Sequence, residues 1–251
     1  MFARQFKGLL KRFGYQLVPI DAAHSPWVAT ETLLKDVPAP VIFDVGACTG
    51  NTIKKYQRLF PASRIYAFEP FTDSFELASA LAAKGDRKHR RPAAGGTTQV
   101  FNIALGAVNG TQTFHVNSFA PTNSLLPSDP RASEVWGPGH YETARTVEVE
   151  VRRLDDFLPT VGVDHIDLMK LDVQGAESQV LEGARGILAR GGIRVIQTEI
   201  IFAPAYEGQK SFAEMSEIFT GLGFELFNLY EMWSINGRIT HCDALFVRAG
   251  G

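Results

Sequence analysis

The feature that most constrains this chain is an apolar run that ends in an acid and then turns at once into the start of a helix. Residues 168–177 read Leu-Met-Lys-Leu-Asp-Val-Gln-Gly-Ala-Glu, so Asp172 closes the run. Open α/β sheets bind ligands outside the carboxyl ends of their strands, and such a junction delivers a carboxylate there. A similar junction lies upstream, where residues 41–50 read Val-Ile-Phe-Asp-Val-Gly-Ala-Cys-Thr-Gly. Together they predict a nucleotide-type cofactor at one end of a sheet.

Strand-like and helix-like segments alternate around these junctions. Core strands are predicted at 41–45, 64–68, 99–105, 166–171 and 193–198, and helices at 51–60, 73–84, 176–189 and 212–222. Further strands are expected at 110–116 and 146–151, a short helix at 154–158, and a closing strand pair at 224–230 and 244–248. Such alternation is typical of a parallel sheet with crossover helices, so we predict an α/β fold.

Breaker residues and composition divide the chain into a preface and one domain. Residues 1–40 are predicted to be an N-terminal helical extension and connector, with Pro26 as its first breaker, and residues 41–251 to be the α/β domain. The segment 117–139 is longer than structure-free loops usually are, so we expect a lid or an acceptor-binding wall. The basic segment 84–98 is predicted to be a solvated loop, with a grip on a phosphate or acidic glycan as the alternative.

The bulk composition excludes several classes of protein. A net charge of -2 gives no global attraction to nucleic acid or to an anionic membrane. Two cysteines, Cys48 and Cys242, are too few for a disulfide framework, and no apolar run is long enough to cross a bilayer. We therefore expect a cytoplasmic protein. Residues 1–13 place aromatic and leucine residues at helical spacing among cations. This predicts a helix that packs on the domain or a partner, with weak membrane-surface contact as the alternative.

Three successive strand ends carry residues that suit an adenosine-bearing ligand. At the first, Asp44 precedes Gly46 and Gly50, and glycines let a backbone turn sharply and approach a ligand. This is not the G-x-G-x-x-G fingerprint, and an acid before the glycines suits a cationic amino group better than a pyrophosphate. Glu69, at the second strand end, can accept hydrogen bonds from ribose hydroxyls. Asn102, at the third, could border an adenine ring.

These motifs resemble the FkbM family of S-adenosylmethionine-dependent methyltransferases over about residues 41–248. The resemblance rests on residues 44–50, 68–70, 102–105, 171–177 and 242–247. Gln174 is a departure, because members often carry glutamate there. The resemblance implies a Rossmann-like, mostly parallel sheet with helices on both faces and a reversed final strand pair. It also implies methyl transfer to an oxygen of a sugar, glycan or polyketide-like acceptor.

The resemblance implies a role for individual residues as well. It assigns the methionyl end of the cofactor to Asp44, Gly46 and Gly50, the ribose to Glu69, and the adenine to Asn102 and Ala104, and it places Asp172 at the heart of the site. The neighbouring motif residues Ala47, Asn51 and Pro70 complete the expected cofactor set.

Methyl transfer to a hydroxyl calls for a group that takes the proton, because a neutral hydroxyl is a poor nucleophile. The candidates are Asp172, Glu199 at the end of the next strand, and His241 before the last strand. Asp172 could instead hold the cofactor or cap the following helix, and Glu199 and His241 could be structural. Asp172 and Glu199 could also share a divalent cation. No local motif demands a metal, so none is assigned.

The long loop supplies the acceptor-binding candidates. Ser124 could contact the acceptor or the cofactor carboxylate, and Trp136 and Tyr141 could stack on a sugar ring. The alternative for Trp136 is an anchor for the loop. The expected partner is therefore a small-molecule or glycan acceptor.

Two competing functions remain open at this stage. An NAD-linked oxidoreductase or epimerase would use the same kind of sheet, but the glycine triplet is missing. A non-catalytic cofactor-binding module would keep the fold without turnover, although Asp44, Glu69 and Asp172 are all intact. A nucleic-acid methyltransferase is disfavoured by the net charge and by the sequence Asp-Val-Gln-Gly at residues 172–175.

Overall fold

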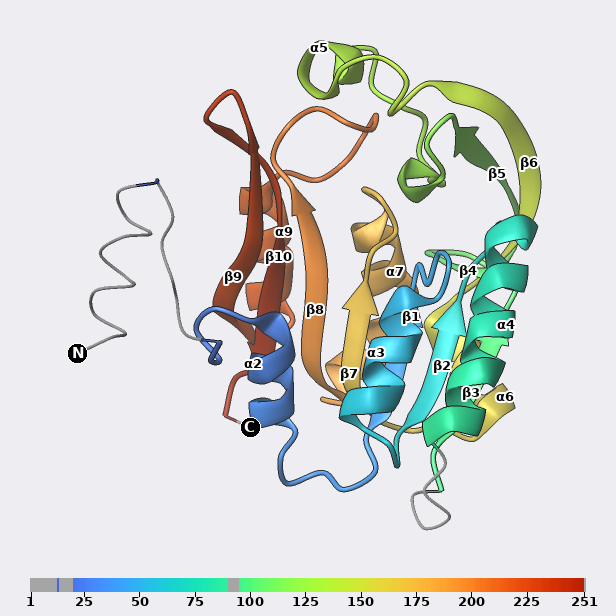
Figure 1. Ribbon diagram of the computed structural model, residues 1–251, viewed down its shortest axis with the longest axis vertical. Coiled ribbons are helices and arrows are strands. Elements are labelled where there is room, and N and C mark those ends of the chain that lie inside the picture. The colour runs from blue at the N-terminus through green and yellow to red at the C-terminus, as the bar shows by residue number, and fades with distance from the viewer. Residues whose placement is uncertain (1–12, 14–19, 90–94, 251) are drawn as a thin grey trace.

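Figure 1 shows the computed structural model, which describes residue 13 and residues 20–89 and 95–250. A seven-stranded sheet of order β3-β2-β1-β7-β8-β10-β9 forms its centre. The strands are β1 (Val41–Val45), β2 (Arg64–Phe68), β3 (Thr97–Phe101), β7 (Ile166–Leu171), β8 (Ile193–Ile201), β9 (Phe224–Ile235) and β10 (Arg238–Arg248). All neighbours pair in parallel except β10, which is antiparallel to both β8 and β9. The predicted Rossmann-like fold is confirmed, and β10 is the reversed strand of the final pair.

Helices cover both faces of this sheet (Figure 1). The helices α2 (Pro26–Leu33), α3 (Asn51–Leu59) and α4 (Thr72–His89) pack on one face, which we call the α3 face. The helices α6 (Leu154–Val161), α7 (Glu177–Gly183), α8 (Arg185–Ala189) and α9 (Phe212–Gly221) pack on the other, the α9 face. The largest apolar cluster lies on the α9 face. The described helices include none that is both long and apolar enough to cross a bilayer.

Alternation along the strands separates apolar from polar side chains. On β1, Phe43 and Val45 join the cluster on the α9 face, whereas Ile42 packs on the α3 face. Successive strand side chains point to opposite faces, so Asp44 shares the α3 face with Ile42. The register of β1 with β7 pairs Asp44 with Lys170. Charged side chains therefore enter the sheet on the α3 face.

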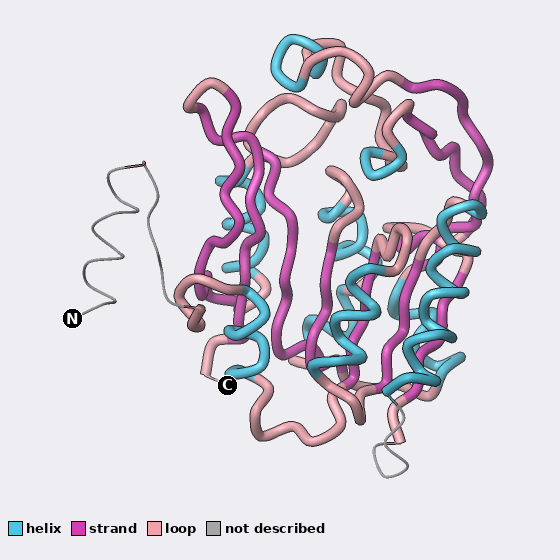
Figure 2. Tube along the Cα trace, in the orientation of Figure 1, coloured by secondary structure: helices cyan, strands magenta, loops and turns pink. Residues whose placement is uncertain are grey.

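A second, three-stranded sheet rises beyond the carboxyl ends of the central strands (Figure 2). Its order is β4-β6-β5, with β4 (Ala104–Leu105), β5 (Gly110–Asn117) and β6 (Thr143–Arg152). The long segment after β5 contains the 3-10 helix η1 (Ala120–Thr122) and the short helix α5 (Ala132–Trp136). The expectation that residues 117–139 act as a lid or acceptor wall stays a prediction, but this segment has regular structure of its own.

Two predictions of single elements are wrong, because the structure has two elements in place of each. The expected strand 99–105 divides into β3 and β4, because Ala104 and Leu105 pair with β6 of the small sheet. The expected helix 176–189 divides at Ala184, where the Asp155 carboxylate accepts bonds from the backbone N–H groups of Gly186 and Ile187 and so caps α8. A helix start that a distant aspartate caps carries no local sequence signal.

Two helix boundaries also differ from expectation. Pro26 begins α2 rather than breaking a helix, because proline suits the first helical turn and the Ser25 side chain caps it. The helix α4 continues to His89, so the first part of the basic segment 84–98 is helical and not a loop. Residues 90–94 of that segment, and the amphipathic helix expected over residues 1–12, lie outside the described residues.

Candidate functional site

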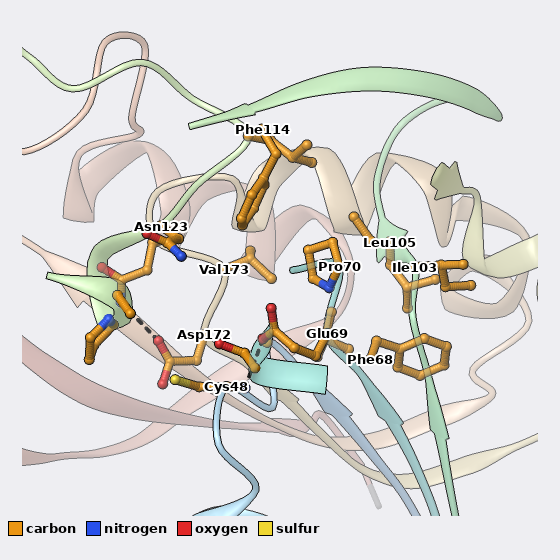
Figure 3. A pocket seen from close by; sticks show the side chains of 18 of the residues that line it. Cys48, Phe68, Glu69, Pro70, Ile103, Leu105, Phe114, Asn123, Asp172 and Val173 are labelled. Atoms are coloured by element: carbon orange, nitrogen blue, oxygen red, sulfur yellow. Dashed lines mark hydrogen bonds between the residues drawn. The ribbon is translucent and has the colours of Figure 1, made fainter. Parts of the chain in front are cut away.

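A cavity of about 260 Å³ lies at the carboxyl ends of β1, β2, β7 and β8, beneath the small sheet (Figure 3). Its polar wall is formed by Cys48, Glu69, Ser74, Asn123, Asp172, Gln174 and Glu199, and its apolar wall includes Phe68, Ile103, Leu105, Phe114, Leu125 and Val173. Small-molecule sites are typically apolar concavities with a few convergent polar groups. This cavity is therefore the candidate site.

The β1 turn forms the floor of the cavity. Gly46 has φ +89, and a Cβ atom there would lie 1.9 Å from the carbonyl oxygen of Asp172, so only glycine fits where the β1 and β7 ends meet. The N–H groups of Gly46 and Ala47 donate to the carbonyl of Phe68, at 3.0 and 2.9 Å. Gly50 serves a different purpose, since a Cβ atom there would meet the Ala78 Cα atom of α4 at 2.9 Å. Gly46 thus shapes the cavity, whereas Gly50 lets α3 and α4 pack closely.

Glu69 follows β2 and points toward the cavity (Figure 3). Its Oε2 atom accepts a bond from the Cys48 N–H at 2.8 Å, and its Oε1 atom accepts one from the Phe71 N–H at 2.9 Å. Burial raises the pKa of Glu69 to about 7, although these two bonds favour the charged form. Each carboxylate oxygen can accept a second bond, so Glu69 can still receive ligand hydroxyls.

Two carboxyl groups and one lysine lie together at the ends of β7 and β8. The Lys170 Nζ atom is 2.7 Å from Asp172 Oδ2. The Gln174 amide donates to Asp172 Oδ1 at 2.9 Å and to Glu199 Oε2 at 2.7 Å. Burial disfavours the Asp172 anion, but the Lys170 charge and these bonds outweigh it and lower the Asp172 pKa. Burial and the nearby Asp172 raise the pKa of Glu199 well above its ordinary value.

A row of buried and partly buried polar groups continues beneath the cavity on the α3 face. Asp44 is fully buried, and neither of its carboxylate oxygens has a hydrogen-bond partner among the described residues. Burial raises the pKa of Asp44 to about 6, against the opposing charge of Lys170. Burial likewise raises the pKa of Asp243 to about 6, although Gln197 donates a bond to it at 2.8 Å. Acids outnumber the single lysine in this row, which suits a cationic ligand.

The structure brings together part of the predicted cofactor set. Gly46, Glu69, Pro70, Ala104 and Asp172 line the cavity, whereas Asp44, Ala47, Gly50, Asn51 and Asn102 do not. Asn102 donates from its amide to the carbonyls of Glu69 and Pro70, at 2.9 Å each. It therefore ties the end of β3 to the turn that holds Glu69.

Of the three candidate bases, Asp172 and Glu199 line the cavity and His241 does not. The His241 ring packs against Trp136 and Trp233, with ring centroids 5.4 and 5.9 Å away. Burial lowers the pKa of His241, against the opposing charge of Asp172. The geometry thus favours the two carboxyl groups over the histidine.

The three predicted acceptor-binding residues lie around the site rather than in the cavity lining. Trp136 donates from Nε1 to the carbonyl of Pro204 at 2.8 Å, which fastens α5 to the loop after β8. Tyr141 packs on Trp136, with centroids 5.2 Å apart. Ser124 donates to the carbonyl of Gln174 at 2.7 Å. These contacts hold the long segment against the turn after β7 and the loop after β8.

Sequence reasoning did not assign Lys170 or Gln174 to the site. A lysine inside an apolar strand, two residues before Asp172, is a signal for a buried ion pair, because the two side chains share a face. Gln174 has φ +56, a left-handed conformation for which its sequence gave no signal. The part of the chain described here has no group of three or more His, Cys, Asp or Glu placed to hold a metal ion. Cys48 and Cys242 are both free thiols.

Comparison with known proteins identifies relatives of this chain. A family model described as the methyltransferase FkbM domain matches residues 44–226. The 2-O-methyltransferase NoeI of Sinorhizobium fredii is 31% identical over 187 residues, which cover 70% of this chain and 69% of NoeI. The methyltransferase sdnD of Sordaria araneosa is 30% identical over 162 residues, which cover 57% of this chain and 60% of sdnD.

A solved structure shares the fold. The crystal structure of methyltransferase FkbM from Methylobacillus flagellatus superposes with a TM-score of 0.51 at 14% identity. The superposition covers 84% of this chain and 44% of that one, so the present chain spans less than half of the solved protein.

Proposed function

The chain belongs to the FkbM family of S-adenosylmethionine-dependent methyltransferases, and we propose that it methylates a hydroxyl of a sugar, glycan or polyketide-like acceptor. The observation that carries the proposal is the cavity in which Asp172 and Glu199 face a space bordered by Glu69 and Gly46. The name of the relative NoeI, a 2-O-methyltransferase, supports an oxygen acceptor. Family membership removes the NAD-linked alternative.

The residues at the cavity fit this cofactor. S-adenosylmethionine supplies a methyl group on a positively charged sulfur, and the chain offers an excess of buried acids rather than an anion-binding glycine triplet. The Glu69 carboxylate is free to accept bonds from ribose hydroxyls, and Ile103 and Leu105 supply an apolar wall for the adenine. Gly46 lets the backbone come close to the methionyl end. Asp172 would face the reacting centre.

The acceptor hydroxyl must lose its proton as the new carbon–oxygen bond forms. The carbon–sulfur bond breaks in the same step, and its electron pair stays on sulfur. We assign the proton to Asp172, because Lys170 and Gln174 keep its carboxylate ionised and open to the cavity. The remaining work of the chain is to align the reacting atoms and to exclude water.

The experiment that tests the proposal follows a labelled methyl group by mass spectrometry. Purified protein receives trideuteromethyl-labelled S-adenosylmethionine and a panel of neutral monosaccharides, oligosaccharides and hydroxylated polyketides. We expect one labelled methyl ether on a sugar, lost in the Asp172→Asn variant. Cofactor binding without transfer to any member of the panel would instead support the non-catalytic module.

A further inference from the structure

The Gln174 side chain bridges the two carboxyl groups that line the cavity. Its Nε2 atom lies 2.9 Å from Asp172 Oδ1 and 2.7 Å from Glu199 Oε2. An amide nitrogen carries two hydrogens, and one can be given to each carboxyl group. A glutamine that donates to both acids of a candidate site can orient them, in addition to forming the turn.

Surrounding residues fix the direction of this amide. The Tyr206 hydroxyl has one hydrogen, which is shared between two acceptors at 2.8 Å, Gln174 Oε1 and the carbonyl of Thr122. Ser124 holds the Gln174 backbone through its carbonyl. Because the ionised Asp172 carboxylate can only accept hydrogen bonds, the amide nitrogen Nε2 must face it and Oε1 must face the hydroxyl. A flipped amide would turn an oxygen toward the Asp172 carboxylate.

The backbone at this turn allows little movement. Gln174 has φ +56 and Gly175 has φ +90, and a Cβ atom at Gly175 would lie 2.9 Å from Tyr206 Cδ2. The Tyr206 ring therefore packs against the turn whose side chain it also bonds. Gln174 is held from both its backbone and its side chain, as a residue that must orient others should be.

The two carboxyl groups have unequal surroundings. Asp172 has the Lys170 ammonium at 2.7 Å in addition to the amide. Glu199 forms no ion pair with any described residue, and Gln174 is its bridging donor. Two neighbouring carboxyl groups do not both ionise readily, and the lysine decides which of them does. The shared amide holds both carboxyl groups toward the cavity, while each keeps its own protonation state.

We propose that Gln174 is a positioning residue that divides these carboxyl groups between two roles. It holds Asp172 as the ionised group that receives the proton of the acceptor hydroxyl, and Glu199 as the protonated group that donates a hydrogen bond in the same cavity. The proposal rests on the function proposed above. The proton leaves the acceptor oxygen for an Asp172 oxygen as the methyl ether forms, and Asp172 then releases it to water.

Changing Gln174 to glutamate tests this division directly. The Gln174→Glu variant is isosteric but replaces the donor by a third carboxylate, which disfavours the Asp172 anion. We expect the Asp172 pKa to rise by about one unit or more. The Gln174→Met variant removes the donor without adding charge, and it should raise the same pKa by less. Gln179→Glu, on α7 and outside the cavity lining, is the matched control and should leave it unchanged.

The measurement is carbon-13 NMR of carboxyl-labelled aspartate, with Asp172 assigned from the signal missing in Asp172→Asn. This readout needs no acceptor, and thermal unfolding checks that each variant folds. In the transfer assay, activity of Gln174→Glu should recover as pH rises, because Asp172 works ionised and its titration has moved upward. A purely structural role for Gln174 would lower activity equally at every pH.

Two results would overturn the proposal: an Asp172 pKa that neither Gln174 variant changes, or an Asp172 carboxyl that is protonated at neutral pH in the unaltered protein. Failure of the proposed function is distinguishable, because it would appear as absent methyl transfer with the NMR shifts intact.

Discussion

The two faces of the central sheet use the same strands for opposite purposes. Toward the α9 face, strands β1, β7, β8 and β10 present Phe43, Met169, Ile196 and Phe246 to one continuous apolar cluster. Toward the α3 face, the same strands present the buried Asp44, Lys170 and Gln197 and the partly buried Asp243, and the Lys170 ion pair with Asp172 joins this polar row to the cavity wall. The α9 face forms the apolar core, and the α3 face carries the polar groups next to the candidate site.

The difference between the two faces shows where the fold contains destabilising groups. Burial of apolar side chains stabilises a fold, whereas burial of a charge without a full set of partners opposes it. The unpartnered Asp44 carboxyl lies on the face that carries the site, and no such group lies within the α9 cluster as described. A site that must attract a cationic cofactor therefore keeps acids that a purely structural face would not.

The largest expected effect is on the apolar face. Phe219 of α9 is fully buried and stacks on Phe246, with centroids 4.0 Å apart. We expect Phe219→Ala to lower the free energy of unfolding by about 3–5 kcal/mol, because it leaves a cavity in the core. The dissociation constant for S-adenosylmethionine should stay within about twofold by calorimetry. Weaker binding at unchanged stability would contradict the separation of the two faces.

The next effect is on the polar face and depends on pH. The folded pKa of Asp44, about 6, is above the ordinary 3.8, so the protein loses stability as pH rises through 6. Two pKa units correspond to about 3 kcal/mol. We expect the free energy of unfolding of Asp44→Asn, relative to that of the unaltered protein, to rise by up to this amount between pH 4 and pH 7.5. Chemical denaturation at each pH measures it. A stability difference between the two proteins that is constant with pH would refute this account.

A somewhat smaller loss is expected when the lysine of the polar row is removed. Lys170→Met leaves acids on the α3 face without their cation, and breaking a fully buried pair costs about 3–5 kcal/mol. The Asp172 side chain is 37% exposed, so solvent screening reduces the expected loss to about 2 kcal/mol. Urea denaturation measures it, with the exposed Lys54→Met on α3 as the control. Equal stability of the two variants would show that the row does not need its cation.

The smallest effect sharpens the comparison within the polar face. Glu69→Ala should weaken S-adenosylmethionine binding about tenfold, or about 1.4 kcal/mol, because the ribose hydroxyls lose an acceptor. Titration calorimetry measures the constant, and thermal unfolding of the free variant shows whether the Cys48 and Phe71 N–H groups tolerate the loss. An unchanged dissociation constant would remove Glu69 from the ribose role.

Much of the fold followed from the sequence because its signals are local. Apolar runs that end in Asp44, Phe68 and Leu171 marked the parallel strands. The break at Ala184 did not follow, because the group that caps α8 is a distant aspartate. Where the signal is a long-range contact, a single sequence does not carry it.

Part of the site could also be predicted from the sequence, because some of its signals are local. Strand ends predicted that Asp172 and Glu199 would meet, and they do. The bridging role of Gln174 depends on a left-handed backbone and on Tyr206, more than thirty residues away, so local patterns could not reveal it. Trp136 and Tyr141 have the residue types of a sugar platform, but only the folded loop brings them to Pro204 and Tyr206.

The central claim is that the acid-lined cavity binds a sulfonium cofactor, and titration calorimetry tests it most directly. We predict that S-adenosylmethionine and its demethylated product bind one to one, that NAD does not bind, and that cofactor protects Cys48 in the cavity wall from alkylation. Absence of binding for both S-adenosylmethionine and its demethylated product would contradict the account.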